Sequence, residues 1–255
     1  DPRLPDFPGA FAGDSIHSHA YIDPTTPLEL TGKRILVVGL GNSAADIAVE
    51  LSSRTLENTV TISTRSSAWI VPKYLGGKPA DKYYRTSPHI PFAWQRKIAQ
   101  VFQPLTAGRP ENYGLPKPNH KFFEAHPTQS VELPFRLGAG DVTAKGDISR
   151  LDGDTVHFVD GTSADFDVII YATGYNITFP FFAPDFISAP GNTLRLYKRM
   201  FLPGIDNLVF MGFAQAVPTL FPFVECQARL LAAYAIGRYS LPPRDEMERV
   251  IDADQ

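Results

Sequence analysis

The segment RILVVGLGNSAADIAVELSSR, residues 34–54, constrains the fold more than any other part of this sequence. It opens with an apolar run of strand length that ends in glycine. It continues with a helical pattern whose apolar residues share one face, namely Ala44, Ile47, Ala48 and Leu51. TVTISTR, rich in β-branched residues, is the expected second strand. Because strand, glycine turn, helix and strand fit into about 35 residues, we expect an α/β fold with a doubly wound parallel sheet.

The turn between strand and helix, Gly39-Leu40-Gly41-Asn42-Ser43-Ala44, matches the pattern G-x-G-x-x-A of dinucleotide-binding folds. Gly39 permits the tight turn, Gly41 lets backbone approach a pyrophosphate, and Ala44 lets the helix pack on the strand. The helix start at Asn42 and Ser43 supplies N–H donors and the positive end of the helix dipole. This context favours a Rossmann-like dinucleotide site; the alternative is a merely structural tight turn.

The end of the second strand indicates which dinucleotide would bind. A carboxylate there would accept hydrogen bonds from a ribose 2′-hydroxyl, but the sequence offers Thr64-Arg65-Ser66 and no acid. An arginine flanked by hydroxyls suits a 2′-phosphate, because a guanidinium makes paired, charge-assisted hydrogen bonds to phosphate oxygens. We therefore expect NADP(H) rather than NAD; the alternative is that Arg65 is a solvated surface charge.

Composition argues against several other classes of protein. With 255 residues, 44% of them hydrophobic, the chain can bury the core of one large domain or two smaller ones. A formal net charge of −3 without a basic block gives no reason to expect nucleic acid or an anionic membrane as partner. No apolar run approaches the roughly 18 to 20 residues of a membrane helix. We expect a cytoplasmic protein with small-molecule partners.

The cysteine and histidine content argues against other kinds of site. The single cysteine, Cys226, cannot form an internal disulfide, which favours a reducing compartment, and we expect it to be a packed helix residue. A flavin-linked reductase of the thioredoxin reductase type would be expected to show C-x-x-C, which is absent. His120 and His126 lie outside any metal-ligand spacing, so we expect no metal site.

The remaining segments differ in character along the chain. Residues 1–27 show no helical or strand period and are expected to be loop and connector. Residues 71–134 are rich in proline, and only WQRKIAQVF looks helical, which predicts a long excursion on the surface or over a site. TVHFVDGTSADFDVIIYA predicts a hairpin that feeds a core strand. Further on, NLVFMGF predicts a short strand and FVECQARLLAAYAIGRY a packed helix.

Several motifs resemble those of the flavin-containing monooxygenases, the class B flavoproteins that include the Baeyer–Villiger enzymes. FAGDSIHSHAY, from Phe11 to Tyr21, fits that family's fingerprint F-x-G-x-x-x-H, followed four residues later by an aromatic or acidic residue. GLGNSAAD, the STR segment with Trp69 shortly after, YATGY, FPFF, and MGFAQ with ECQAR follow in the family's order. Together these motifs span most of the chain.

The resemblance implies roles for residues that the patterns alone leave undistinguished. Thr173, Gly174 and Tyr175 would lie where the chain crosses from the NADP domain back into the FAD domain. Gln215 would approach the nicotinamide or flavin ring, and His17 would help to couple the two domains rather than serve as a general base. From the residues alone, Thr173 and Gly174 would be a strand-end turn, Gln215 a surface amide and His17 an ordinary loop histidine.

The resemblance also divides the chain into three parts. Residues 1–27 would be a fingerprint segment from the FAD domain. Residues 28–168 would be the NADP-binding domain, with the excursion at 71–134. Residues 169–255 would be the C-terminal part of the second dinucleotide domain, the one for FAD.

The family's FAD turn, G-x-G-x-x-G, has no counterpart in this sequence, since neither Gly138-Ala139-Gly140 nor Gly76-Gly77 precedes a helical pattern. The FAD pocket is therefore expected to be incomplete in this chain. An apolar face left open at VIIYATGY or NLVFMGF would mark an interface or an aggregation liability. Three explanations stay open: a partner chain supplies the FAD half, the sequence is a fragment, or a homodimer covers the exposed face.

The resemblance implies an oxidoreductase, an FAD- and NADPH-dependent monooxygenase in which the flavin holds dioxygen as a C4a-hydroperoxyflavin. Tyr21 is typical of the branch that oxygenates nitrogen or sulfur, whereas the Baeyer–Villiger branch usually shows Trp or Asp there. We therefore expect N- or S-oxygenation of small soft nucleophiles. Two alternatives stay open: a Baeyer–Villiger monooxygenase, and a non-catalytic NADP(H)-binding module or subunit that needs a partner chain.

Overall fold

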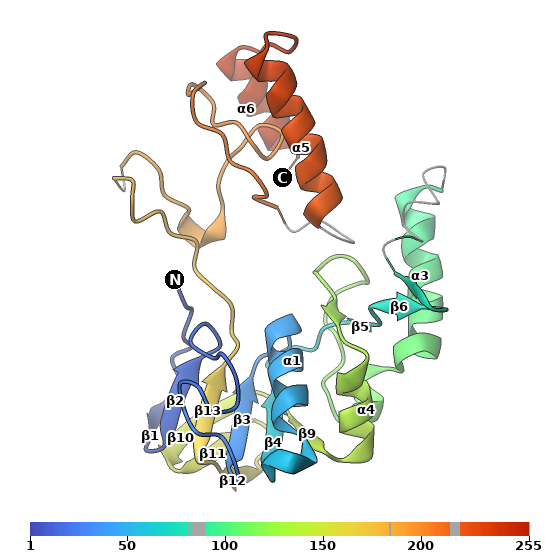
Figure 1. The fold of residues 1–255 in the computed structure, drawn as a ribbon, viewed down its shortest axis with the longest axis vertical. Coiled ribbons are helices and arrows are strands. Elements are labelled where there is room, and N and C mark those ends of the chain that lie inside the picture. Colours follow the sequence, from blue (N-terminus) through green and yellow to red (C-terminus); the bar gives the residue numbers. More distant parts are fainter. Residues whose placement is uncertain (81, 83–89, 184, 215–219, 255) are drawn as a thin grey trace. The chain divides into compact units, whose positions relative to one another are not determined.

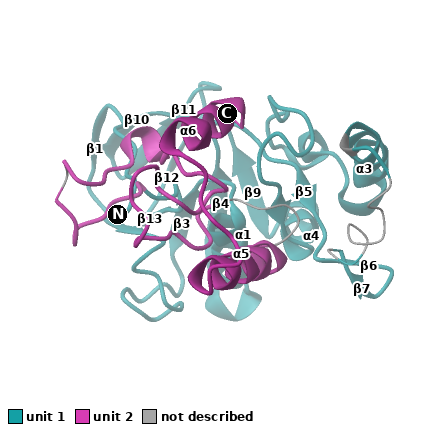
Figure 2. Cartoon of the chain, turned by 90° about the horizontal axis from the view of Figure 1, so that it is seen from above, with its two compact units in different colours: residues 1–175 teal, residues 176–255 magenta. Residues whose placement is uncertain are grey.

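The computed structural model describes residues 1–80, 82, 90–183, 185–214 and 220–254. The chain divides into two compact units, residues 1–175 and 176–255, coloured teal and magenta in Figure 2. The first unit contains the glycine turn and all of the segments 1–27 and 28–168. The assignment of these segments to NADP and FAD domains stays a prediction.

A five-stranded, fully parallel sheet forms the centre of the first unit (Figure 1). Its strands, in spatial order, are β2 (Asp14–His17), β13 (Val168–Tyr171), β3 (Arg34–Val38), β4 (Thr59–Ser63) and β9 (Val142–Lys145). The predicted strand, turn, helix and strand are present as β3, α1 (Asn42–Leu51) and β4, which confirms the expected α/β fold. Because β4 and β13 lie on opposite sides of β3, the strand order reverses at β3. Doubly wound sheets bind ligands at such a point, beside the carboxyl ends of the strands.

Alternate side chains of β3 pack on opposite faces of this sheet. Ile35 and Val37 join one apolar cluster with residues of α1 and α4 (Glu132–Ala139), and Leu36 and Val38 join a second cluster. The second cluster includes residues of a four-stranded sheet, whose spatial order is β1 (Gly9–Phe11), β10 (Ile148–Gly153), β11 (Thr155–Phe158) and β12 (Ser163–Asp165). The central strands are thus covered on both faces, which explains their continuous apolar sequences.

Two sequence-based expectations for this unit are wrong. Residues 1–27 are not only loop and connector, because β1 pairs in parallel with β10 and β2 pairs in parallel with β13. VIIYATGY leaves no open apolar face at its strand, because β13 lies between β2 and β3 and its residues 168–170 are at most 2% exposed. The hairpin β11–β12 ahead of it is present as predicted.

The excursion between β4 and β9 is built from short elements. After the turn η1 (Arg54–Leu56) and β4, its elements are β5 (Ile70–Val71), β6 (Tyr74–Leu75), β7 (Lys78–Pro79), α3 (Phe92–Ala107), η2 (Pro110–Tyr113), β8 (Thr128–Gln129) and α4. The predicted helix WQRKIAQVF lies within α3. β5 pairs in parallel with β8, and α4 contacts both α1 and β9, so the excursion returns onto the parallel sheet.

The second unit has a small core of its own. In its described residues it contains η3 (Pro190–Asn192), α5 (Leu220–Ala235) and α6 (Arg244–Ala253). The core consists of Tyr197, Met200, Phe201, Met247 and Ile251. Across the described part of the chain, no helix combines the length and apolar character needed to cross a bilayer.

Two predictions for this unit are also wrong. NLVFMGF forms no strand; it makes only an isolated bridge between Val209 and Phe201, because no strand runs beside it in the described residues of this unit. The helix predicted at FVECQARLLAAYAIGRY is present as α5, but Cys226 on it is exposed rather than packed. The reason is that α5 has only Gln227 as a fully buried residue.

Candidate dinucleotide-binding site

The predicted site residues of the first unit meet at one edge of the parallel sheet. The last residues of the strands are in register, pairing His17 with Tyr171, Tyr171 with Val38, and Val38 with Ser63. Parallel strands place their carboxyl ends at the same edge, so the segments that follow β3, β4 and β13 lie beside one another there. The sheet thus brings together residues that are more than 100 positions apart in the sequence.

Gly39 sits directly against the end of β13. Its φ is +126°, a conformation that side chains disfavour, and its N–H donates to the carbonyl of Ser63 at 2.8 Å. A Cβ at this position would lie 2.4 Å from the carbonyl oxygen of Ala172. The first glycine of the motif is therefore required by the approach of two backbone segments.

The space around Gly41 is open, in contrast to the close backbone contact at Gly39. Gly41 is the N-cap of α1, with an extended backbone (φ −82°, ψ −178°) that any residue can adopt, and no heavy atom lies within 4 Å of where its Cβ would be. No side chain caps the helix, so its first N–H groups are left for solvent or a ligand. An open cradle of backbone donors fits a pyrophosphate, and a methyl group on Gly41 would partly fill it.

The three residues after Gly41 have different environments. Ser43 is exposed, whereas Ala44 is fully buried in the cluster that joins α1 to the sheet. The side chain of Asn42 accepts a hydrogen bond at Oδ1 from the backbone N–H of Gln129, at 2.8 Å. Its amide oxygen, an acceptor, is thus engaged by β8.

The segment after β4 carries a cationic side chain that no other described residue engages. Arg65 is exposed, and no hydrogen bond or ion pair engages its guanidinium within the described ranges. Thr64 is buried, and its hydroxyl donates to the carbonyl of Ser66 at 2.7 Å. Of the two hydroxyls predicted beside Arg65, that of Thr64 therefore shapes the turn, and Arg65 is the group that fits a 2′-phosphate.

His17 uses both of its ring nitrogens. The backbone N–H of His19 donates to Nδ1 at 3.0 Å, and Nε2 lies 3.0 Å from the carbonyl oxygen of Gly174. A backbone N–H can only donate and a carbonyl can only accept, so Nε2 carries the proton and Nδ1 does not. Burial lowers the pKa of His17, and the bond to Gly174 opposes this only in part. A neutral ring with both nitrogens engaged fits a link between segments rather than a general base.

The chain's first residues bind the same segment after β13. Pro2 forms an antiparallel bridge with Tyr175, and the N–H of Arg3 donates to the carbonyl of Gly174 at 3.0 Å. The guanidinium of Arg3 donates to the carbonyl of Thr173 at 2.8 Å, and the Thr173 hydroxyl donates back to the carbonyl of Arg3. Sequence reasoning missed Arg3, since no local signal marks a partner 170 residues away.

Tyr175 and Gln215 complete the predicted set. The Tyr175 ring, about half exposed, meets the ring of His17 edge-on, with centroids 5.2 Å apart. Gln215 lies outside the described residues.

Tyr21, the last residue of the fingerprint, attaches this segment to α1, the helix after the glycine turn. Its hydroxyl donates to Oε2 of Glu50 on α1 at 2.9 Å. Burial raises the pKa of Tyr21, and the bond to Glu50 acts in the same direction. The hydroxyl therefore remains a donor at neutral pH and ties the fingerprint to the helix that follows the glycine turn.

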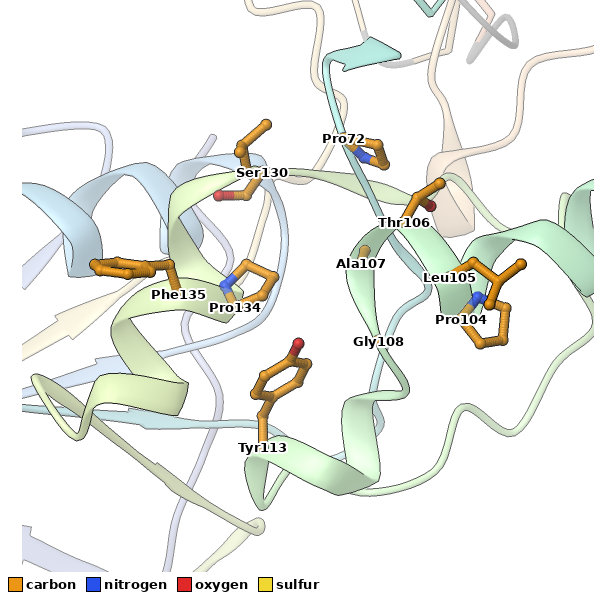
Figure 3. Close-up of a pocket in the computed structure, with 11 residues that line it drawn as sticks. Pro72, Pro104, Leu105, Thr106, Ala107, Gly108, Tyr113, Ser130, Pro134 and Phe135 are labelled. Carbon is orange, nitrogen blue, oxygen red and sulfur yellow. The ribbon is translucent and has the colours of Figure 1, made fainter. Parts of the chain in front are cut away.

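A separate pocket lies within the excursion (Figure 3). It has a volume of about 450 Å³ and lies between the end of α3, η2 and the start of α4; its lining includes Pro72, Leu105, Tyr113, Pro134 and Phe135. None of the predicted site residues that the structure describes lines it. The pocket is therefore distinct from the carboxyl edge of the sheet.

Protonation of His17 is expected to weaken the first unit at acidic pH. Its pKa in the folded chain is below the ordinary value of 6.5, so the unfolded chain binds the proton first as the pH falls. The contribution of His17 to stability is then complete above about pH 6.5 and is lost below it, by less than about 1.4 kcal/mol per pH unit. His19 lowers the same pKa to a smaller extent.

Urea unfolding at a series of pH values between 5 and 8 measures this effect. His17→Gln keeps a donor for Gly174 but does not titrate, so it should flatten the fall in unfolding free energy. His157→Gln, at a half-buried histidine on β11, is the matched control and should keep the wild-type slope. If the unfolding free energy of His17→Gln fell with pH as steeply as that of wild type, the assigned tautomer and the bond that links His17 to Gly174 would be contradicted.

Comparison with known proteins gives relatives over nearly the whole chain. The family described as "Flavin-binding monooxygenase-like" matches residues 2–255. The N-oxide-forming dimethylaniline monooxygenase 2 of Oryctolagus cuniculus is 37% identical over 259 residues, which are 96% of this chain and 47% of that protein. Flavin-containing monooxygenase 5 of Homo sapiens is 34% identical over 270 residues, 99% of this chain and 48% of that protein. The chain thus spans about half the length of the relatives it matches.

Solved structures of low sequence identity share the fold. Tmm from Pelagibacter sp. strain HTCC7211 superposes with a TM-score of 0.61 at 22% identity, over 99% of this chain and 42% of that one. S-allyl-L-cysteine S-oxygenase from Allium sativum gives 0.61 at 23%, over 99% and 44%. An open cyclohexanone monooxygenase gives 0.63 at 16%, over 98% and 64%. At such identities the likeness bears on the fold alone.

Proposed function

Because this chain belongs to the flavin-binding monooxygenase-like family, we propose that it forms the NADPH-binding part of an FAD- and NADPH-dependent monooxygenase for nitrogen or sulfur atoms of small molecules. The observation that carries the proposal is the open cradle at Gly41 beside the unengaged guanidinium of Arg65. Both groups lie at the carboxyl edge of the parallel sheet, where this class of fold binds dinucleotides.

In this proposal, each group at the carboxyl edge of the sheet has its own role. The first N–H groups of α1 bind the pyrophosphate, and Arg65 binds the 2′-phosphate that distinguishes NADPH from NADH. NADPH, when bound, would supply the hydride that reduces a flavin. Arg3, His17 and Thr173 hold together the two segments that the resemblance assigns to crossings between the NADP and FAD domains.

The choice between the branches of the family rests on the relatives. The rabbit relative is named for N-oxide formation, and the garlic structure is titled an S-oxygenase. The likeness to cyclohexanone monooxygenase, at 16% identity, supports only the shared fold, so the Baeyer–Villiger alternative has less support. Tyr21 favours the nitrogen and sulfur branch by resemblance alone, since its contact here is with Glu50 of the chain itself.

A second candidate is a module or subunit that binds NADP(H) and needs a partner chain or a second copy for oxygenation. The observation that favours it is the presence of one glycine turn, without a second G-x-G-x-x-G, in the sequence. The residues present therefore fit one dinucleotide and do not fit the pyrophosphate of FAD as well. Under this candidate, FAD would require a further strand, turn and helix from outside these 255 residues.

Ligand binding by the purified chain tests the proposal. We expect calorimetric titration to show NADPH bound at least about tenfold more tightly than NADH, the ratio that one charge-assisted pair would give. Absorbance at about 450 nm then tests the second candidate, because flavin bound to the purified chain would contradict a module that needs another chain for FAD. A chain that binds neither nicotinamide dinucleotide would contradict both candidates.

A further inference from the structure

Two hydrogen bonds join the excursion to the glycine turn. The hydroxyl of Thr128, at the start of β8, donates to the carbonyl oxygen of Leu40. The N–H of the next residue, Gln129, donates to Oδ1 of Asn42 at 2.8 Å. Thr128 is only 2% exposed, so its hydroxyl is not available to a dissolved ligand. These bonds connect β8 to the two residues on either side of Gly41.

The bond from Thr128 determines where the N–H of Gly41 points. In a trans peptide, the C=O of one residue and the N–H of the next lie on opposite sides of the peptide plane. Because Thr128 holds the Leu40 carbonyl toward β8, the N–H of Gly41 is turned away from β8. That N–H therefore cannot be donated to β8 and stays available for the pyrophosphate.

Strand β8 is itself fixed to the segment that carries Arg65. The N–H of Thr128 donates to the carbonyl of Trp69 at 2.9 Å, and the N–H of Ser130 donates to the carbonyl of Val71 at 3.1 Å. Trp69 lies four positions after Arg65 along the chain. One short strand thus ties the turn at Gly41 to the region of Arg65, which are the two predicted contact points of the dinucleotide.

We propose that Thr128, and Asn42 through its Oδ1, orient the glycine turn for the pyrophosphate by their bonds to Leu40 and Gln129, Thr128 acting without touching the ligand itself. This inference rests on the proposed NADPH site. It gives the Oδ1 of Asn42 a role in holding β8. It also assigns a function to the excursion, because its strand β8 sets the geometry of the proposed phosphate-binding turn.

Thr128→Val tests the inference, because it removes the hydroxyl and keeps the shape of the side chain. We expect NADPH to bind about threefold to tenfold more weakly, the effect of one lost hydrogen bond. Adenosine 2′-phosphate lacks the pyrophosphate, so its affinity, measured by NMR titration, should not change. Thr128→Ser should restore NADPH binding. Thr106→Val is the matched control, since that hydroxyl bonds within α3, to the carbonyl of Gln103 at 3.0 Å.

Asn42→Ala is a second variant at an exposed position, and the same selective loss of NADPH affinity is expected. Thermal unfolding of every variant checks that the chain is folded. Unchanged NADPH affinity in both Thr128→Val and Asn42→Ala would overturn the inference while leaving the NADPH site intact. Equal weakening of NADPH and adenosine 2′-phosphate would also overturn it, because the effect would not be specific to the pyrophosphate. A wild-type chain that binds no NADPH would remove the proposed function and this inference together.

Discussion

Gly39→Ala is expected to destabilise the first unit by about 3 kcal/mol or more, combining a strained φ with a steric clash. The φ of +126° disfavours any side chain, and the new methyl group would lie 2.4 Å from the carbonyl oxygen of Ala172. Gly39 and Ala172 directly follow the paired strands β3 and β13, and the contact is with a backbone atom, so no side-chain rotation relieves it. Urea unfolding followed by circular dichroism measures the loss.

Gly41→Ala is the matched control, two residues along the same turn. Its backbone conformation suits alanine and its Cβ would enter open space, so stability should change by less than about 0.5 kcal/mol. NADPH affinity should nevertheless fall at least about tenfold, because the methyl group fills part of the pyrophosphate cradle. If Gly41→Ala bound NADPH normally, the cradle would not be the binding site. If both variants were equally unstable, the two glycines would not have the separate roles assigned to them.

The unit β3, α1 and β4 could be predicted because its determinants are local. The apolar run, the glycines and the helical face all lie within residues 34–65, and each pattern has a period that a short window reveals. The helix in the excursion and the hairpin before β13 were predictable for the same reason. In each case the residues that determine the element are also the residues that form it.

The strands at residues 9–17 could not be predicted from local pattern. β1 has three residues and β2 has four, too few to show alternation, and both lie at sheet edges. What makes them strands is backbone pairing with β10 and β13, which are more than 130 residues further along the chain. The same limit applies to the bond from Thr128 to Leu40, across 88 residues.

The candidate site shows a second limit of reasoning from residue types. Thr64 carries a hydroxyl that suits a phosphate, and the sequence places it beside Arg65. In the folded chain, however, the hydroxyl of Thr64 donates to the carbonyl of Ser66. A motif identifies which polar groups are near a ligand, but competition from the chain's own backbone decides which of them are free to bind it.

Arg65→Ala is expected to weaken NADPH binding about tenfold to a hundredfold, the range for losing hydrogen bonds to a charged group. NADH, which has no 2′-phosphate, should bind as before. The prediction follows from the exposed, unengaged guanidinium at the end of β4 and from the lack of an acid beside it. Arg65→Lys keeps the charge but loses the paired donors, so its NADPH affinity should fall between wild type and alanine.

Arg54→Ala is the matched control for Arg65→Ala. Arg54 is also exposed but lies in η1, between the end of α1 and the start of β4, and therefore at the opposite edge of the sheet from Arg65. Its removal changes the net charge equally, so a nonspecific electrostatic effect would lower NADPH affinity to a similar extent in both variants. Titration of each variant with NADPH and NADH separates the cases. A parallel loss for both cofactors, or for both variants, would mean that Arg65 is a solvated surface charge and that the preference for NADPH has another source.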